Sequence, residues 1–240
     1  MTEKRKTALI TGGAKRLGKE ICLKLAESCY NIAFSYLTSE KESKQTEEQI
    51  KRLGVDALRY KTDLTDYDQV KEFFKYAHKS FGKISVLINN ASVFNRTPFN
   101  ELNHISFDNT IAANLSAYYY TSLEASKYMK KEGRIINISS LGGTKPYKNY
   151  LPYSVSKAGV DMLTKCLALE LAPRILVNSI APGVLKMKGE KRKEYLPTIE
   201  SIPLKKHGNT IEITNFILYL INSEYITGQI FLIDGGKVLN

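Results

Sequence analysis

The sequence has no tryptophan and only three cysteines among its 240 residues. Cys22, Cys29 and Cys166 are odd in number and lack the spacing of metal ligands, which argues against both a disulfide framework and a metal site. All three lie in stretches with the pattern of amphipathic helices. We therefore expect them to be small core residues of a protein in a reducing compartment.

Long hydrophobic runs are also missing, since no stretch approaches the roughly 20 apolar residues that a membrane-spanning helix needs. The first residues, Met1–Lys6, lead into an apolar strand without the sustained hydrophobic region of a secretory signal. We expect a cytoplasmic protein that does not enter a membrane.

Acidic residues are in deficit, with 24 Asp and Glu against 35 Lys and Arg and a formal net charge of +11. Most of the lysines are scattered over predicted helices, which is typical of a solvated surface and does not indicate a nucleic-acid partner. The basic residues are denser at Lys186–Lys193 and at Lys205–Lys206.

Short apolar runs alternate with longer segments of helical period along the whole chain. The predicted strands are Thr7–Thr11, Asn31–Tyr36, Ala57–Lys61, Ser85–Ile88, Arg134–Ile138, Ile175–Ile180 and Ile230–Ile233. The predicted helices are Leu17–Ser28, Lys41–Leu53, Tyr67–Phe81, Ile111–Lys131, Tyr153–Leu171 and Ile211–Ile221, with Ser39 and Asp66 as helix caps. This alternation predicts an α/β fold, a single domain with a Rossmann-like doubly wound parallel sheet and right-handed crossovers.

A glycine-containing turn, Thr11–Gly18, joins the first predicted strand to the first predicted helix. Such a turn can present backbone N–H groups and a helix N-terminus to a pyrophosphate, and Gly12 and Gly18 would permit close approach. Glycines at this place can also serve tight packing alone. The position in the first β-α unit favours nucleotide binding.

No carboxylate stands at the end of the second predicted strand, where NAD-binding folds usually carry one for the ribose hydroxyls. The hydroxyls of Thr38 and Ser39 and the cations of Lys15 and Arg16 are suited instead to a 2′-phosphate. Glu40 follows the expected cap and should point along the helix toward solvent. The sequence thus favours NADPH over NADH.

Tyr153 and Lys157 are spaced i and i+4, which places a phenol and an ammonium on one face of a helix. A nearby cation lowers the pKa of a tyrosine and suits it to proton transfer. Tyr67 and Lys71 have the same spacing, so the spacing alone indicates little. The context separates the two pairs, because Ser140 follows a strand end, where open α/β sheets bind their ligands.

Two asparagine positions leave alternatives open. Asn114 lies in an otherwise apolar helix and is either a satisfied core amide or a residue that holds a water at the site. The segment Asn89–Ser92 after the fourth strand is either a turn or a cofactor wall.

These motifs together resemble the short-chain dehydrogenase/reductase family over nearly the whole chain. They are Thr11–Gly18, Asp63, Asn89–Ala91, Asn114, Ser140, Tyr153 with Lys157, Pro182–Gly183 and Asp234–Gly236. The resemblance implies that Tyr153 is the general acid, that Ser140 orients the reacting group, that Lys157 binds the nicotinamide ribose and that Asn114 holds a relay water. The implied NADPH-binding residues are Gly12, Lys15, Arg16, Leu17, Gly18, Ser39, Asp63, Leu64, Asn90, Ala91, Tyr153, Lys157, Pro182 and Gly183.

Arg16 and Ser92, where most members have glycine, together with Phe94, resemble the pteridine reductases and dihydromonapterin reductases. The resemblance implies a substrate site of Arg16, Ser92, Phe94, Ser140 and Tyr153, with Phe94 stacked on the pterin. Ser140 argues the other way, because those reductases commonly carry aspartate there. Serine is the pattern of ketone and alcohol enzymes.

Our leading hypothesis is hydride transfer from NADPH to a pterin-like small molecule. The alternative is a ketone reductase, such as one acting on 3-oxoacyl groups of an acidic carrier protein that would dock on Lys186–Lys193. A non-catalytic nucleotide sensor is a remote third possibility. The segment Leu185–Ile202 should shape the substrate pocket. From the resemblance we also expect a homo-oligomer, a tetramer, that pairs through Ile111–Lys131 and Tyr153–Leu171.

Overall fold

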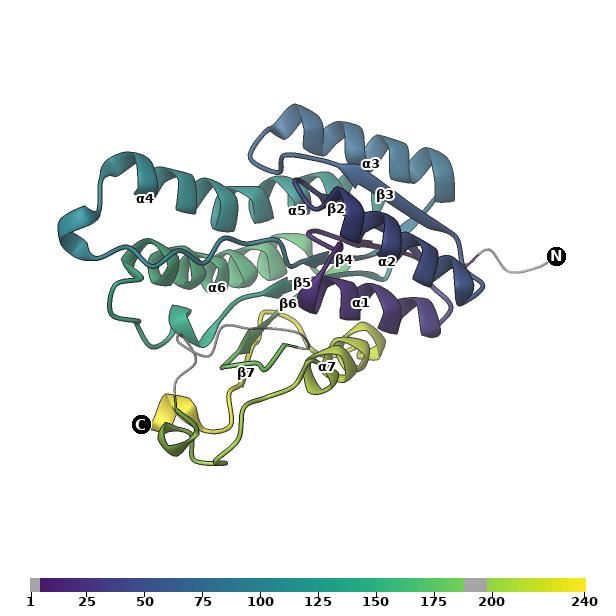
Figure 1. Cartoon of the computed structure of the whole chain (residues 1–240). Coiled ribbons are helices and arrows are strands. Elements are labelled where there is room, and N and C mark those ends of the chain that lie inside the picture. Colours follow the sequence, from purple (N-terminus) through teal and green to yellow (C-terminus); the bar gives the residue numbers. More distant parts are fainter. Residues whose placement is uncertain (1–4, 188–197) are drawn as a thin grey trace.

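The computed structural model describes residues 5–187 and 198–240, and these form one seven-stranded, wholly parallel sheet of order β3-β2-β1-β4-β5-β6-β7 (Figure 1). The strands are β1 (Thr7–Ile10), β2 (Asn31–Tyr36), β3 (Ala57–Lys61), β4 (Ile84–Asn89), β5 (Gly133–Ile138), β6 (Ile175–Pro182) and β7 (Ile230–Ile233). This arrangement confirms the predicted Rossmann-like α/β fold. The basic run from 188 to 193 lies outside the described residues.

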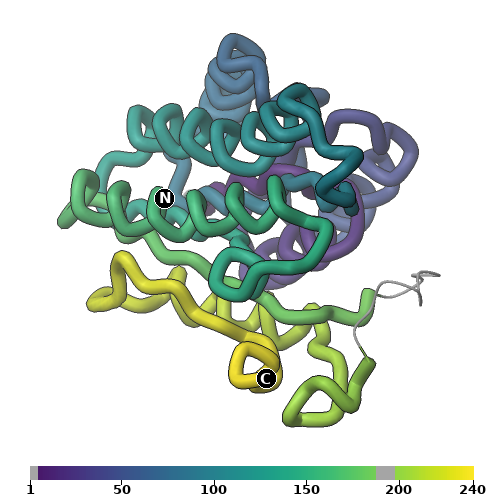
Figure 2. Tube along the Cα trace, turned by 90° about the vertical axis from the view of Figure 1, so that its left-hand side faces the viewer, coloured from purple at the N-terminus to yellow at the C-terminus, as the bar shows by residue number. Residues whose placement is uncertain are grey.

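Helices cover both faces of the sheet (Figure 1). They are α1 (Arg16–Glu27), α2 (Glu40–Arg52), α3 (Tyr67–Phe81), α4 (His104–Ile111), α5 (Ala117–Tyr128), α6 (Leu151–Leu171) and α7 (Thr210–Asn222). Figure 2, turned so that the left-hand side of Figure 1 faces the viewer, shows α4 and α5 in teal beside α6 in green.

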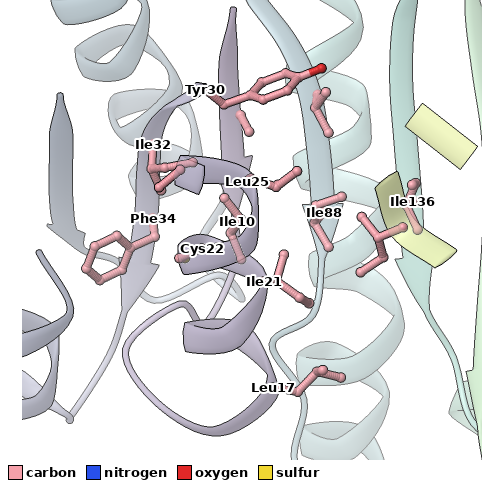
Figure 3. Packing of buried hydrophobic residues seen from close by; sticks show 14 of the residues in the cluster. Ile10, Leu17, Ile21, Cys22, Leu25, Tyr30, Ile32, Phe34, Ile88 and Ile136 are labelled. Atoms are coloured by element: carbon pink, nitrogen blue, oxygen red, sulfur yellow. The ribbon is translucent and has the colours of Figure 1, made fainter. Parts of the chain in front are cut away.

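The apolar strands supply two cores because their side chains alternate between the faces of the sheet. Ile10 belongs to the cluster under α1 and α7, whereas its neighbour Leu9 belongs to the cluster under α3, α5 and α6. Figure 3 shows the first cluster, in which Leu17, Ile21 and Leu25 of α1 pack onto the strands. Burial on both faces explains why these strands read as continuous apolar runs.

One crossover departs from the predicted handedness. The chain moves across the sheet in the same direction from β5 to β6 and from β6 to β7, yet α6 and α7 lie on opposite faces, α7 beside α1 (Figure 1). The β6–α7–β7 unit is therefore left-handed. Ile213, Ile217 and Leu220 of α7 complete the core on the face that α1 and α2 leave partly uncovered. The long connection between β6 and α7 allows the chain to reach that face.

The helix predicted at 111–131 is more complex than its period suggested. It begins earlier, at His104, where the Asn103 and Ser106 side chains form a capping box. Between α4 and α5 the residues Ala112–Ser116 form a π-helical turn. Of the predicted caps, Asp66 accepts hydrogen bonds from two backbone N–H groups, but Ser39 stands at the N-cap position without a side-chain capping bond.

The expectation for the cysteines is correct only for Cys22, which is buried; Cys29 and Cys166 are exposed. Cys29 lies just beyond α1 with a φ of 64°. Within residues 5–187 and 198–240 no group of three or more metal-ligating side chains occurs, and no described helix is long and apolar enough to span a membrane. Apolar side chains on the helices expected to pair copies of the chain, such as Tyr119, Met162 and Leu169, are exposed. The tetramer stays a prediction.

A buried network of amides and hydroxyls joins the centre of the sheet to α5 and α6. Asn89 of β4 donates to Asn137 of β5 (2.9 Å) and to Ser122 of α5 (3.0 Å). Thr121 of α5 donates to the Asn89 Oδ1 atom (2.7 Å), and Asn137 donates to Thr164 of α6 (2.9 Å). All five side chains are fully buried. The network thus fixes both helices over two adjacent strands.

Asn137→Ala should lower the free energy of unfolding by about 2–4 kcal/mol, because it leaves one N–H of the buried Asn89 amide without its acceptor and removes the donor to the Thr164 hydroxyl. Chemical denaturation measures the change. The matched control is Asn109→Ala on α4, where the side chain is exposed and the expected change is within about 0.5 kcal/mol. Equal losses in the two variants would contradict the role of the network.

Candidate active site

The predicted site residues gather along the edge of the sheet where the parallel strands end. Thr11 follows β1, Asn90 follows β4, Ser139 and Ser140 follow β5, and Gly183 follows β6. Ligands of open α/β sheets bind at this carboxyl edge. The structure therefore brings together the motifs that lie far apart in the sequence.

The turn after β1 is held by the segment after β4. The Thr11 hydroxyl accepts hydrogen bonds from the backbone N–H groups of Asn90 (2.8 Å) and Ala91 (3.0 Å). The Asn90 amide donates in return to the carbonyl oxygens of Thr11 (3.0 Å) and Gly12 (3.3 Å). In the segment Asn89–Ser92, Asn89 is a buried core residue, whereas Asn90 and Ala91 pack against the Thr11–Gly12 turn and hold it in place. Whether they also contact a cofactor stays a prediction.

Three residues of this turn are sterically constrained. Gly12 has a φ of 67°, and a Cβ on Gly18 would lie 2.1 Å from the Gly12 carbonyl oxygen. Arg16 has a φ of 53°, in the left-handed region that favours glycine. This explains why glycine is the commoner residue there in the resembled family. The turn and the start of α1 form a cradle that suits a pyrophosphate, with Leu17 buried beneath it and Lys15 exposed beside it.

The edge beside β2 and β3 refines the expectation for Glu40. Its side chain is exposed, as expected, but its carboxylate is paired, because it accepts hydrogen bonds from the Tyr36 hydroxyl and from Arg59 of β3 (2.6 Å). Arg59 also binds Glu47 (2.9 Å). Because the Glu40 carboxylate is paired with Arg59, it is not a free acid beside Ser39 at the end of β2.

The residues expected near the adenine lie on the same side. The Asp63 carboxylate accepts hydrogen bonds from the backbone N–H (2.9 Å) and hydroxyl (2.7 Å) of Thr65, which forms a tight turn after β3. Leu64 is partly buried against the second core. At the other end of the site, Pro182 ends β6, and a Cβ on Gly183 would lie 2.7 Å from the Asp234 backbone.

Tyr153 and Lys157 lie in the first two turns of α6, both buried. The Lys157 ammonium donates to the Ile138 carbonyl oxygen (2.8 Å) and approaches the Tyr118 hydroxyl (3.5 Å). Burial lowers the pKa of Lys157 to about 7, while the Asp161 carboxylate acts in the opposite direction. Lys157 therefore exchanges a proton near neutral pH.

The pKa of Tyr153 moves in the direction opposite to the one we expected. Burial is the dominant effect and raises the pKa of the phenol, while the Ser140 side chain lowers it. Ser140 accepts a hydrogen bond from the Gly142 backbone N–H (3.0 Å) and also lowers the pKa of Tyr147. Tyr153 thus stays protonated at neutral pH, as a proton donor must be.

Asn114 lies in the π-helical turn between α4 and α5, and its side chain is satisfied by the protein. Its amide oxygen accepts from the Val93 backbone N–H (2.8 Å), and its amide nitrogen donates to the Val93 carbonyl (3.0 Å) and to Ser156 (3.1 Å). Of the two alternatives, the geometry supports a buried, structural amide. Asn114 and Lys157 lie on different helical segments, and the role of Asn114 in holding a relay water stays a prediction.

Phe94 lies at the mouth of the site and is 47% exposed. Its ring stacks on Tyr150, with centroids 4.4 Å apart, and meets Tyr153 edge-on at 4.6 Å. Tyr147 and Tyr150 were not predicted as site residues. Tyr150 and Tyr147 lie three and six residues before Tyr153, and this spacing was the available signal. Both residues precede α6, however, so the spacing of a helix does not apply to them. Ser92, two residues before Phe94 in the sequence, is exposed.

The second Tyr–Lys pair has a structural explanation. The Tyr67 hydroxyl donates to the buried Glu124 carboxylate of α5, and Lys71 pairs with Asp68 on its own helix. The side chains of this pair thus have structural partners, and the assignment of Tyr153 and Lys157 as the catalytic pair stays a prediction.

Comparison with known proteins gives consistent matches. The family model described as short chain dehydrogenase matches residues 6–195. A 3-oxoacyl-[acyl-carrier-protein] reductase, FabG, of Staphylococcus aureus is 34% identical over 244 residues, covering 98% of each chain. The solved short-chain dehydrogenase/reductase of Serratia marcescens superposes with a TM-score of 0.92 at 30% identity, covering 97% of this chain and 98% of that one. A Burkholderia cenocepacia short chain dehydrogenase in complex with NADP has a TM-score of 0.91 at 26% identity and covers 97% of both chains.

Gly18→Ala should weaken NADPH binding by at least about tenfold, which corresponds to roughly 1.4 kcal/mol, because its Cβ would collide with the Gly12 carbonyl and displace the turn. It should also lower the melting temperature, although alanine normally stabilises a helix relative to glycine. Fluorescence titration measures the binding.

Gly159→Ala on α6 is the matched control. Its Cβ would meet only the flexible Leu115 side chain, 2.7 Å from the Cδ2 atom, and we expect near-normal NADPH affinity. Wild-type affinity in Gly18→Ala would remove the turn from the cofactor site.

Proposed function

The chain belongs to the short chain dehydrogenase family, and from that premise we propose that it reduces the ketone of a 3-oxoacyl thioester with NADPH. Members of this family are NAD(P)-dependent oxidoreductases. The 3-oxoacyl substrate and the preference for NADPH are the parts that we propose. Pterin reduction, the leading hypothesis from the sequence, becomes the alternative.

The observation that carries the ketone proposal is the Ser140 hydroxyl beside the Tyr153 phenol. Two neutral hydroxyls can both hydrogen-bond one carbonyl oxygen, one as a donor that orients it and one as the acid that protonates it. An additional acid, which would help to protonate a ring nitrogen, is missing at this position. The resemblance to the 3-oxoacyl-[acyl-carrier-protein] reductase of S. aureus supports the same choice.

The aromatic side of the site offers less to a pterin than the sequence suggested. One face of Phe94 is already covered by Tyr150. A flat substrate would have to use the opposite face or displace Tyr150, which would forfeit a stacking contact of roughly 0.5–1.5 kcal/mol. Phe94 and Tyr150 together form an apolar wall, which suits an acyl chain as well.

The proposed mechanism assigns a proton and an orientation to named side chains. NADPH, when bound along the carboxyl edge, supplies the hydride that the carbonyl carbon accepts. Ser140 orients the carbonyl, and Tyr153 donates its phenolic proton to the carbonyl oxygen. Lys157, with a pKa of about 7, holds the ribose and can return a proton toward Tyr153. Asn114 fixes the loop at Val93 and remains the proposed anchor of a relay water.

Initial rates with an acetoacetyl thioester, a dihydropterin and folate, each with NADPH and NADH, test the proposal. We expect the thioester with NADPH to give the highest kcat/KM. Tyr153→Phe should lower kcat by about 100-fold or more while NADPH affinity is nearly kept, because only the acid is lost. A dihydropterin reduced well while the thioester is not would overturn the ketone proposal. Near-normal kcat in Tyr153→Phe would remove that residue from its role.

Ser39→Asp should shift the cofactor preference from NADPH toward NADH, because a carboxylate at the end of β2 repels the 2′-phosphate and can accept the ribose hydroxyls. The ratio of kcat/KM for the two cofactors measures the shift. Glu42→Asp, which alters an exposed acid on α2, should leave the ratio unchanged. Equal efficiency with both cofactors in the unmodified enzyme would defeat the proposed preference.

A further inference from the structure

A depression of about 760 Å³ lies at the amino edge of the sheet, opposite the candidate active site. Residues at the starts of β4, β5 and β6 form its wall, together with the last turn of α7. Its polar lining includes the hydroxyl-bearing side chains of Tyr30 and Ser85. None of the proposed catalytic or cofactor residues reaches it.

Positive charge dominates this depression, which we call the amino-edge pocket. Its lining includes five cationic residues against two acidic ones, Lys6, Lys83, Lys131, Arg134 and Arg174 against Glu132 and Glu224. Among the described residues no salt bridge joins any of the five to an acid. Within residues 5–187 and 198–240 the excess of positive charge is therefore not neutralised by ion pairs.

The two arginines are held in place by backbone oxygens. Arg174 donates to the carbonyls of Ser126 (2.7 Å) and Met129 (2.5 Å), and Arg134 donates to the carbonyls of Gly133 (3.1 Å) and Ser223 (2.9 Å). These bonds leave the Arg134 Nε atom buried without a partner in the described part of the chain. The two guanidinium groups are thus fixed at the wall of the pocket, where their positive charge attracts an anion.

The lysines have no such partners. No hydrogen bond or ion pair within residues 5–187 and 198–240 involves the ammonium groups of Lys6, Lys83 or Lys131. Helices α3, α5 and α6 end at this edge, so cations here also complement helix C-termini. Arg174 bonds to carbonyls at the end of α5 and Arg134 to the carbonyl of Ser223 at the end of α7, whereas the three lysines make no bond of this kind among the described residues.

We propose that the amino-edge pocket binds a small anion carrying a phosphate group and at least two negative charges. Helix dipoles repel anions at this edge, so the side-chain cations must supply the attraction. Binding should therefore depend on the lysines and weaken steeply with added salt. The volume of the pocket lies within the usual range of small-molecule sites and is large enough for a phosphorylated metabolite.

Isothermal titration calorimetry with inorganic pyrophosphate tests the proposal, with NADP⁺ present so that the glycine-rich turn is occupied. We expect one additional site in the unmodified protein. Lys83→Gln combined with Lys131→Gln should weaken pyrophosphate binding by about tenfold or more, because two unpaired charges are removed from the pocket. Both lysines are exposed, so the fold should be kept.

Lys41→Gln combined with Lys75→Gln is the matched control, since it removes the same charge from exposed positions on α2 and α3. It should change pyrophosphate affinity by less than about twofold. Equal weakening in both double variants would show a general charge effect and overturn the proposal, as would the absence of any pyrophosphate binding in the presence of NADP⁺. The readout is heat of binding, so its failure is independent of the proposed reductase activity.

Discussion

The hydrogen bond between Asn89 and Asn137 is the contact on which the arrangement of the site depends. It joins the last residue of β4 to the last but one residue of β5, and the other bonds of the network reach α5 through Thr121 and Ser122 and α6 through Thr164. A buried amide that has every partner is rigid, and one that loses a partner is costly. Since α6 carries Tyr153 and β5 leads to Ser140, the network fixes the distance between the two hydroxyls that the proposed reaction needs.

The strands were predictable to within one or two residues because burial on both faces makes most of them apolar runs, as β2 and β4 illustrate. The face on which α7 packs could not be predicted, because no local sequence pattern indicates which side of the sheet still lacks a covering helix. Asn137 was missed for a related reason. A single amide within Ile135–Ile138 gives no sign of the Asn89 it meets across the sheet. The pairing of Glu40 was missed because Glu40 begins α2 and its partner Arg59 lies far along the chain in β3.

The two edges of one parallel sheet differ electrostatically, and the chain treats them differently. At the carboxyl edge the N-terminus of α1 and the backbone of the glycine-rich turn provide positive potential, so few cationic side chains are needed. At the amino edge the helix ends are negative. Positive potential there must come from side chains such as Lys83, Lys131 and Arg134. The residues that give the net charge of +11 are therefore not all scattered over a solvated surface, because some of them are concentrated at the amino edge of the sheet.

Burial acts on the two members of the catalytic pair in complementary directions. It raises the pKa of the Tyr153 phenol and lowers the pKa of the Lys157 ammonium to about 7, because in each case the neutral form is favoured away from water. Before a cofactor binds, the pair therefore holds a protonated phenol beside a lysine that exchanges its proton readily. A protonated phenol is the form that the proposed proton donation to a carbonyl oxygen needs, and Lys157 is placed to resupply the proton. The same burial that fixes the geometry of α6 thus also keeps the proposed acid in its working protonation state.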